Sequence, residues 1–225
     1  MIDYSKFLNN SIQEIKPSGI RKFFDIASEM DDVISLSIGE PDFQTPWHIR
    51  EEGINSLKNG KTWYSPNRGF AQLREEIANY YARRFNISYE GKTQVLVTVG
   101  GSEAIDLAFR CLVSEGDEVI IPEPSFVCYE PLTHMAGGKA VIINTKAEDQ
   151  FRLKADDLEK AITDKTKLVV LPFPNNPTGA IMEKADLEAI AEVIKKHDLF
   201  VLSDEIYCEL TYGGKNHISI AAIDG

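Results

Sequence analysis

The chain is short of basic residues and cysteines, and each shortage argues against a class of protein. Its 225 residues include 24 lysines and arginines against 35 aspartates and glutamates, a formal net charge of -11. No run of basic residues offsets this charge. Because contact with phosphate backbones needs clustered positive charge, we do not expect nucleic acid as a partner. Cys111, Cys128 and Cys208 are odd in number and lack CxxC spacing, so we expect reduced thiols and no disulfide framework.

Long apolar runs and metal-ligand patterns are also missing. No stretch approaches the roughly 20 apolar residues that span a bilayer. The first six residues lack the basic region and apolar core of a secretion signal. We therefore expect a cytoplasmic protein with no membrane partner. The histidines show no spacing such as HExxH, so no metal site is predicted from His48, His134, His197 and His217.

What is present is an alternation of strand and helix patterns after an irregular start. Residues 1–45 are broken by prolines and glycines and resemble an arm, whereas residues 46–225 form the main domain. Alternation of this kind predicts an α/β fold with a largely parallel sheet and helices on both faces. Apolar, β-branched runs predict strands at Val95–Val99, Val119–Ile121, Ala140–Ile143, Leu168–Leu171 and Phe200–Leu202.

Three apolar stripes at helical spacing lie before or between these runs. They comprise Phe70, Leu73, Ile77 and Tyr80 or Tyr81; then Ile105, Ala108, Phe109 and Leu112; and then Leu187, Ile190, Ala191 and Ile194. The last stripe joins two predicted strands into a strand-helix-strand unit. A parallel crossover returns the chain to the same edge of the sheet, so Asn176 and Asp204 should lie side by side at the carboxyl ends of their strands.

Two glycines and a serine connect the first predicted strand to its helix. Gly100, Gly101 and Ser102 would let the backbone approach a ligand, and the helix start offers free N–H groups and a positive dipole end. The segment therefore predicts a phosphate cradle. The competing interpretation is a plain glycine turn in which Ser102 is the N-cap of the helix.

Other polar and aromatic residues follow the ends of different parallel strands, at the same edge of the sheet. Asp204 would hold a pyridine nitrogen protonated, Asn176 and Tyr207 would bond a ring hydroxyl, and Phe126 would stack on the ring. This set is typical of a site for pyridoxal 5'-phosphate (PLP). Each residue also has an ordinary structural interpretation, as a cap for Asp204, a turn residue for Asn176 and a core aromatic for Phe126.

At this point the chain resembles the class I and II family of PLP-dependent aminotransferases, over nearly its whole length. The fold implied is that of the aspartate aminotransferase-like enzymes, with residues 1–45 as an arm of the small domain and residues 46–225 as the PLP-binding large domain. Six motifs match in order: SIGEPDF at 37–43, YSPNRG at 64–69 before Leu73-Arg74, GGSEA at 100–104, GDEV at 116–119, NPTG at 176–179 and SDEIY at 203–207.

The resemblance implies further residue roles. Gly39 would touch the substrate carboxylate through its backbone, and Asn176 would also contact the substrate. Gly101 and Ser102 would donate N–H groups to the cofactor phosphate. Tyr64 would reach the phosphate in the neighbouring subunit of a homodimer, although a core aromatic is its ordinary alternative.

The family's lysine that bonds covalently to the cofactor, and two arginines that follow it, have no counterpart in these residues. Lys215 lies too early, in a Gly213-Gly214-Lys215 turn. In this family two later strands would lie between the strand at Val95–Val99 and the strand at Phe200–Leu202. We therefore expect the 225 residues to be the N-terminal part of a longer protein, inactive alone, with unpaired strand edges.

The function implied is transfer of an amino group between an L-amino acid and a 2-oxo acid, with Asp204 and Tyr207 as catalytic residues. A PLP-dependent carbon-sulfur lyase would share the same fold and ring contacts. The GEPDF arm at 39–43 resembles the transaminase version more closely. A third alternative is a non-catalytic PLP-sensing domain of a regulator, which would need a basic DNA-binding domain.

Overall fold

The structure is a computed structural model that describes residues 4–13 and 43–224, with a few single positions between these ranges. The chain divides into two compact units, one of residues 16–67 and one of residues 1–15 with 68–225. Most of residues 1–45, including Gly39, lie outside the described residues. The boundary at residue 45 therefore stays a prediction.

The smaller unit contributes one described helix, α3, which spans Trp47–Lys58. Pro46 precedes it, and two backbone N–H groups close it, that of Asn59 donating to the Asn55 carbonyl oxygen and that of Gly60 to the Leu57 carbonyl oxygen. Proline suits this place because the first helical turn has no partner for its N–H groups. Tyr64 follows in the same unit with a fully exposed side chain, at 100% of its reference area.

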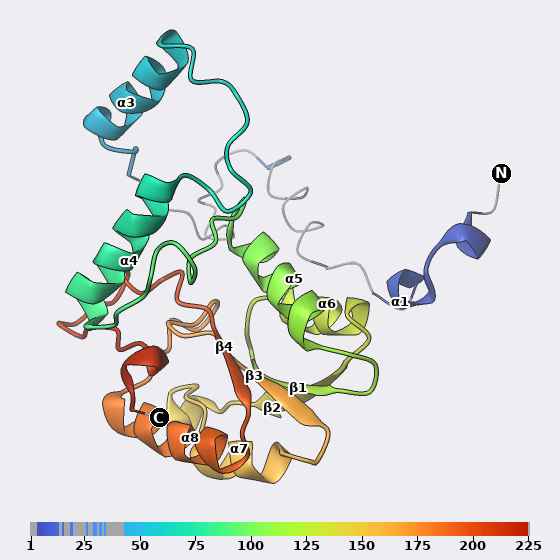
Figure 1. Ribbon diagram of the computed structural model, residues 1–225. Helices are drawn as coiled ribbons and strands as arrows, with labels where there is room; N and C mark the ends of the chain where they lie inside the picture. Colours follow the sequence, from blue (N-terminus) through green and yellow to red (C-terminus); the bar gives the residue numbers. More distant parts are fainter. Residues whose placement is uncertain are drawn as a thin grey trace. The chain divides into compact units, whose positions relative to one another are not determined.

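A four-stranded parallel sheet forms the centre of the larger unit (Figure 1). Its strands are β1 (Glu118–Glu123), β2 (Lys139–Asn144), β3 (Thr166–Leu171) and β4 (Phe200–Ser203), in the order β2-β1-β3-β4. Every neighbouring pair is parallel, with Val169 opposite Ile120 on one side and Val201 on the other. Four of the five predicted strands and the α/β class are therefore confirmed.

Helices cover both faces of this sheet, with α5 and α6 on one face and α7 and α8 on the other (Figure 1). The described helices of the unit are α1 (Asn10–Gln13), α4 (Ala71–Phe85), α5 (Gly101–Leu112), α6 (Tyr129–Met135), α7 (Ala155–Ala161) and α8 (Lys184–Lys196), with 3-10 turns at Ser5–Phe7, Ala147–Asp149 and Ile220–Ala222. In the described part of the chain, no helix combines the length and apolarity that crossing a bilayer requires.

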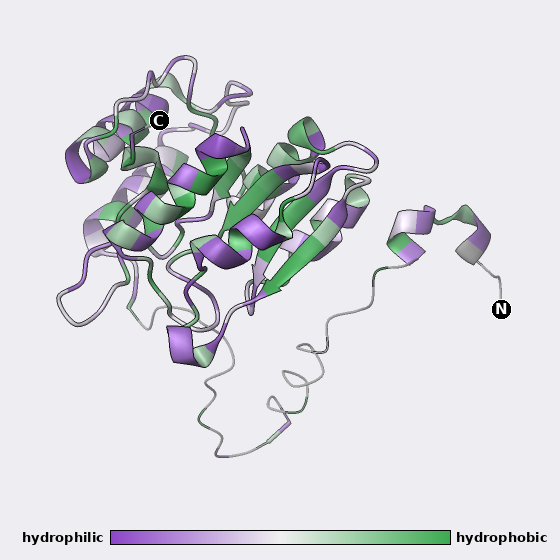
Figure 2. Ribbon diagram, turned by 90° about the horizontal axis from the view of Figure 1, so that it is seen from below, coloured by the Kyte–Doolittle hydropathy of each residue, from purple (hydrophilic) through white to green (hydrophobic). Residues whose placement is uncertain are grey.

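The strands are buried on both faces, which explains their unbroken apolar sequences. In β3, Leu168 and Val170 belong to the core beneath α5 and α6, whereas Val169 and Leu171 belong to the core beneath α7 and α8. Successive strand residues point to opposite faces, so a run without polar residues is what a sheet between two helical layers needs. Figure 2 shows these strands in the hydrophobic colour.

Helix α8 shows how local sequence sets an element in place. Its predicted apolar stripe is the buried face, formed by Leu187, Ile190, Ala191 and Ile194. Glu183 and Asp186 form a capping box in which each side chain accepts from the other residue's backbone N–H. The helix thus begins where the chain must leave the site loop and return toward β4.

Two expectations about the first part of this unit were wrong. The segment Val95–Val99 is not a strand, and Val99 is 93% exposed. Its β-branched composition favours a strand, but a strand also needs a partner for its backbone ladder, and none of the four strands pairs with it. The stripe that predicted α4 also differs from the buried face, because Leu73 is exposed whereas Ala78 and Phe85 are buried.

Candidate active site

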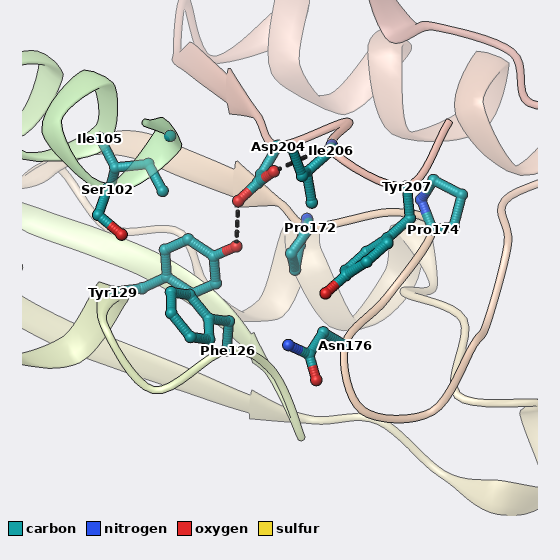
Figure 3. A pocket seen from close by; sticks show the side chains of 11 residues that line it. Ser102, Ile105, Phe126, Tyr129, Pro172, Pro174, Asn176, Asp204, Ile206 and Tyr207 are labelled. Carbon is teal, nitrogen blue, oxygen red and sulfur yellow. Dashed lines mark hydrogen bonds between the residues drawn. The ribbon is translucent and has the colours of Figure 1, made fainter. Parts of the chain in front are cut away.

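A cavity of about 180 Å³ opens at the carboxyl end of the sheet, where α5 begins and the loops after β1, β3 and β4 meet (Figure 3). Open α/β sheets bind ligands at this edge because the loops there are free to diverge. The residues that line the cavity are Gly101, Ser102, Ile105, Phe126, Tyr129, Pro172, Pro174, Asn176, Asp204, Ile206 and Tyr207.

Asp204 is the cavity's carboxylate, and its position is fixed by the sheet. Its backbone N–H donates to the Leu171 carbonyl oxygen at 3.0 Å, which extends the pairing of β3 and β4 by one residue. Its Oδ1 accepts from the backbone N–H of Ile206 at 3.2 Å, and its Oδ2 accepts from the Tyr129 hydroxyl at 2.8 Å. Both carboxylate oxygens are therefore held from the protein side.

The loop after β3 supplies an amide to the same cavity. Asn175 is buried and forms the turn, because its Oδ1 accepts from the backbone N–H and the hydroxyl of Thr178. Asn176 is the next residue, and its side chain lines the cavity. In Figure 3 the hydroxyl of Tyr207 points toward Asn176. An amide and a phenol are thus both available to one ligand group.

The start of α5 forms another wall. Gly100 is the N-cap residue with φ 86°, a left-handed backbone that favours glycine. No side chain caps this end within the described residues, and Ser102 lies inside the first turn, so it is not the N-cap. The Glu103 carboxylate instead accepts from the backbone N–H of Val99. The first-turn N–H groups at Gly101 and Ser102 thus border the cavity near a positive dipole end.

Two aromatic residues close the floor of the cavity. The rings of Phe126 and Tyr129 meet edge to face, with their centroids 6.2 Å apart and an interplanar angle of 84°. Phe126 is 37% exposed and Tyr129 only 1%. Phe126 is therefore accessible to a ligand in the cavity, whereas Tyr129 packs against it from the buried side.

A second cavity of about 490 Å³ adjoins the first along β4 and α5. Both cavities are lined by Gly101, Ile105, Asp204 and Ile206, so they share one wall. The larger one is lined mainly by apolar side chains, among them Leu202 and Ala108. A ring-sized ligand at Asp204 therefore has apolar surroundings on this side.

A buried pair of side chains, a carboxylate and an imidazole, lies next to Asp204 in the chain. Glu205 accepts from the hydroxyls of Ser203 and Ser219, each at 2.8 Å. The Nε2 of His217 lies 3.2 Å from Glu205 Oε2, although these two atoms are not aligned for a hydrogen bond. Burial opposes the charge of Glu205, but the imidazole and the two hydroxyls outweigh it and hold its pKa below the usual value.

Six residues singled out in the sequence line this one cavity: Gly101, Ser102, Phe126, Asn176, Asp204 and Tyr207. Gly39 lies outside the described residues, and Tyr64 belongs to the smaller unit. Sequence reasoning missed Tyr129. Its one signal is an aromatic residue three positions after Phe126, at the start of a helix. The roles of all these residues remain predictions.

The arrangement suits a flat, polar, negatively charged ligand. Asp204 offers a carboxylate to a ring N–H, and Asn176 with Tyr207 offers donors to a ring oxygen. A phosphate fits the first turn of α5, where N–H groups and the dipole coincide. These donors, the aromatic face of Phe126 and the apolar wall fit a phosphorylated pyridine cofactor such as PLP.

Comparisons with known proteins agree with this chemistry. A family model described as aminotransferase class I and II matches residues 31–224. The chain is 51% identical over 221 residues to YugH of Bacillus subtilis, a protein named as an aminotransferase; the match covers 98% of this chain and 57% of that protein. It is 44% identical over 218 residues to the aromatic-amino-acid aminotransferase 2 of Thermococcus litoralis, covering 97% and 56%.

Solved structures give the same picture. The crystal structure of a Pyrococcus protein called protein A1 matches with a TM-score of 0.93 and 45% identity, over 96% of this chain and 56% of that one. The chain thus spans about half the length of the curated relatives it matches.

Proposed function

Because the chain belongs to the class I and II aminotransferase family, we propose that the whole protein transfers an amino group between an L-amino acid and a 2-oxo acid. Members of this family generally depend on PLP. The observation that supports the proposal best is the single cavity that gathers Asp204, Asn176, Tyr207, Phe126 and the start of α5. Each of these groups matches one part of PLP.

PLP, when bound, supplies an electron-withdrawing ring that stabilises negative charge at the substrate's α-carbon. In our proposal Asp204 keeps a proton on the ring nitrogen, and its carboxylate charge compensates the positive charge there. Asn176 and Tyr207 donate hydrogen bonds to the ring hydroxyl oxygen and fix the tilt of the ring. Phe126 packs on one ring face and excludes water from it.

The remaining roles concern the two ends of the bound molecules. The N–H groups at Gly101 and Ser102 hold the phosphate. The cofactor is thus bound at its phosphate by the start of α5 and at its ring hydroxyl by Asn176. Asn176 also contacts the substrate, and Gly39 binds the substrate carboxylate through its backbone. Both proposals for Gly39 and Asn176 rest on motif positions in the sequence.

We also propose a cytoplasmic homodimer, in which Tyr64 reaches the phosphate in the neighbouring subunit. The exposure of Tyr64 within its own unit supports this role, since a phenol that serves another subunit must be accessible. Fractionation of cells and sedimentation of the whole protein test location and assembly. The relatives described above are named as aminotransferases, so the lyase and sensor alternatives gain no support.

One experiment tests the reaction and the substrate together. The whole protein is loaded with PLP and mixed, without a 2-oxo acid, with alanine, aspartate, glutamate, phenylalanine or a diaminopimelate derivative. We expect at least one amino acid to convert the bound cofactor to its amino form, seen by absorbance, and to release the matching 2-oxo acid. A cysteine S-conjugate is included as a further compound, and release of pyruvate, ammonia and a thiol from it, without the amino form of the cofactor, would identify a lyase.

A further inference from the structure

The one protein side chain that donates to the Asp204 carboxylate is Tyr129, within the described residues. Its hydroxyl lies 2.8 Å from Asp204 Oδ2 (Figure 3). The two residues are 75 positions apart in the sequence, so the contact depends on the fold and not on a local turn. Because the partner of this buried phenol lines a ligand cavity, the hydrogen bond can affect ligand binding as well as the packing of the core.

Tyr129 cannot easily move away from this partner. It is 1% exposed and belongs to the core beneath α5, together with Phe109 and Leu168. It is also the first residue of α6, and its carbonyl oxygen accepts from the hydroxyl of Thr133, which is fully buried. A tyrosine has two side-chain torsions, and burial of the ring restricts both. The hydroxyl therefore stays at one place in the cavity wall.

The hydroxyl also stays a donor. Burial, followed by the charge of Asp204, raises the pKa of Tyr129 well above its usual value. The nearby Cys128 thiol is neutral for the same reasons, since burial and Asp204 raise its pKa to about 12. Tyr129 and Cys128 are thus both neutral beside Asp204. A donor to a carboxylate oxygen favours the charged form of the carboxylate.

The remaining acceptor positions on Asp204 lie open to a ligand. Each carboxylate oxygen can accept two hydrogen bonds. Oδ1 uses one on the backbone of Ile206, and Oδ2 uses one on Tyr129. Two fixed donors on the protein side leave the carboxylate in one orientation, with acceptor capacity toward the cavity. The same tyrosine packs against the ring of Phe126, the other group expected to contact the cofactor ring.

We infer that Tyr129 is a positioning residue of this site: its hydroxyl holds the Asp204 carboxylate in one orientation, toward the ring nitrogen of the cofactor. The inference rests on the proposed function, because it assumes that the cofactor's ring nitrogen meets Asp204. Tyr129 itself touches the carboxylate and not the reacting atoms. It acts through Asp204, and this distinguishes it from a tyrosine that only fills the core.

The test compares the whole wild-type protein with Tyr129→Phe, which removes one hydroxyl and keeps the ring. PLP labelled with ¹⁵N at the ring nitrogen reports protonation through its chemical shift, and fluorescence titration gives the dissociation constant. For Tyr129→Phe we expect a smaller protonated fraction of the ring nitrogen and about tenfold weaker PLP binding, the loss of one hydrogen bond to a charged group. kcat should fall while KM for the amino acid changes little.

A matched control is available on the surface. Tyr80 also donates its hydroxyl to a carboxylate, that of Glu209 at 2.5 Å, outside the two cavities. Tyr80→Phe should leave the ¹⁵N shift and PLP affinity unchanged. In an Asp204→Ala background, Tyr129→Phe should have no further effect on either quantity, because the residue acts through the carboxylate.

A second substitution covers the case in which Tyr129→Phe fails to fold. Replacement of Tyr129 by 3-fluorotyrosine keeps the shape of the ring and makes the phenol a stronger donor, so the protonated fraction should rise. An unchanged ¹⁵N shift in whichever of the two proteins folds would overturn the inference. If the wild-type protein itself does not bind PLP, the proposed function is wrong. This outcome differs from an unchanged ¹⁵N shift, which overturns only the role of Tyr129.

Discussion

Asn175 and Asn176 are adjacent in the chain but serve different parts of the structure. The side chain of Asn175 is buried and accepts two hydrogen bonds from Thr178, at 3.1 Å from its backbone nitrogen and 2.8 Å from its hydroxyl. The side chain of Asn176 faces the cavity. The ordinary interpretation of an asparagine in this motif, a turn residue, thus applies to Asn175.

The pair allows stability and cofactor binding to be separated. Asn175→Ala should lower the free energy of unfolding by about 1–3 kcal/mol, because it leaves two partly buried donors of Thr178 without their acceptor. Asn176→Ala should change stability by less than about 0.5 kcal/mol but weaken PLP binding. Urea unfolding of the apo protein and PLP titration measure the two effects. Equal loss of stability in both variants would show that Asn176 also holds the turn.

For Asp204 we predict a folded protein with a disabled site. Asp204→Ala should bind PLP weakly and transaminate more slowly by orders of magnitude, since nothing then holds the proton on the ring nitrogen. Asp204→Asn is the matched control for shape, because it keeps a hydrogen-bond acceptor for Tyr129 but has no charge. Stopped-flow half-reactions with an amino-acid substrate measure the rate. Wild-type rates in Asp204→Asn would remove the need for a carboxylate.

The start of α5 should recognise the phosphate of the cofactor and not its ring. Ser102→Ala removes one hydroxyl next to the first-turn N–H groups, and we expect PLP affinity to fall by about tenfold for a lost charge-assisted hydrogen bond. Affinity for pyridoxal, which has no phosphate, should stay the same. Titration of both compounds against both proteins gives the comparison. Equal weakening for the two would place Ser102 near the ring.

Much of the fold was predictable because its signals are local. The apolar runs of β1 to β4 and the stripe of α8 depend on spacing within a few residues, and the parallel order places Asn176 and Asp204 at one edge. The segment at Val95–Val99 has the same composition but is not a strand. Composition reports a preference for extended backbone, whereas a strand also requires a neighbour with which to pair.

The site was predictable only in part, for a related reason. Motif positions identified Ser102, Asn176 and Asp204, each of which follows a predicted strand. Tyr129 could not be found in this way, because its contact with Asp204 spans 75 positions and depends on how α6 packs under α5. The pairing of Glu205 with His217 is similar, since neither residue has a local pattern that indicates burial.

The buried pair next to Asp204 should make stability depend on pH. The pKa of Glu205 is lowered in the folded protein, so the carboxylate favours folding above its unfolded-state pKa, near the usual glutamate value. This contribution is lost as pH falls through the lowered folded-state value. Its charge also contributes to the raised pKa of Tyr81 and Tyr89, after burial.

The corresponding variant is Glu205→Gln. Its free energy of unfolding should lie below that of the wild type at neutral pH, and the two curves should approach each other as pH falls below about 4. Urea unfolding at several pH values provides the data. Glu188→Gln is a surface control on α8, whose side chain is half exposed. Parallel curves for wild type and Glu205→Gln would show that burial leaves Glu205 uncharged.

Tyr64 and Asp204 allow a test of whether the site is shared between subunits. Tyr64→Phe should weaken PLP binding, and Asp204→Ala should abolish the reaction. Each homodimer alone should therefore have low transaminase activity when the PLP concentration is limiting. A hybrid dimer contains one Tyr64→Phe subunit and one Asp204→Ala subunit. If Tyr64 serves the neighbouring site, one of its two sites has both defects and the other has none. Random exchange of subunits should therefore restore about a quarter of the sites, since half of the dimers are hybrids. If each tyrosine serves its own subunit, every hybrid site retains one defect, and mixing recovers no activity.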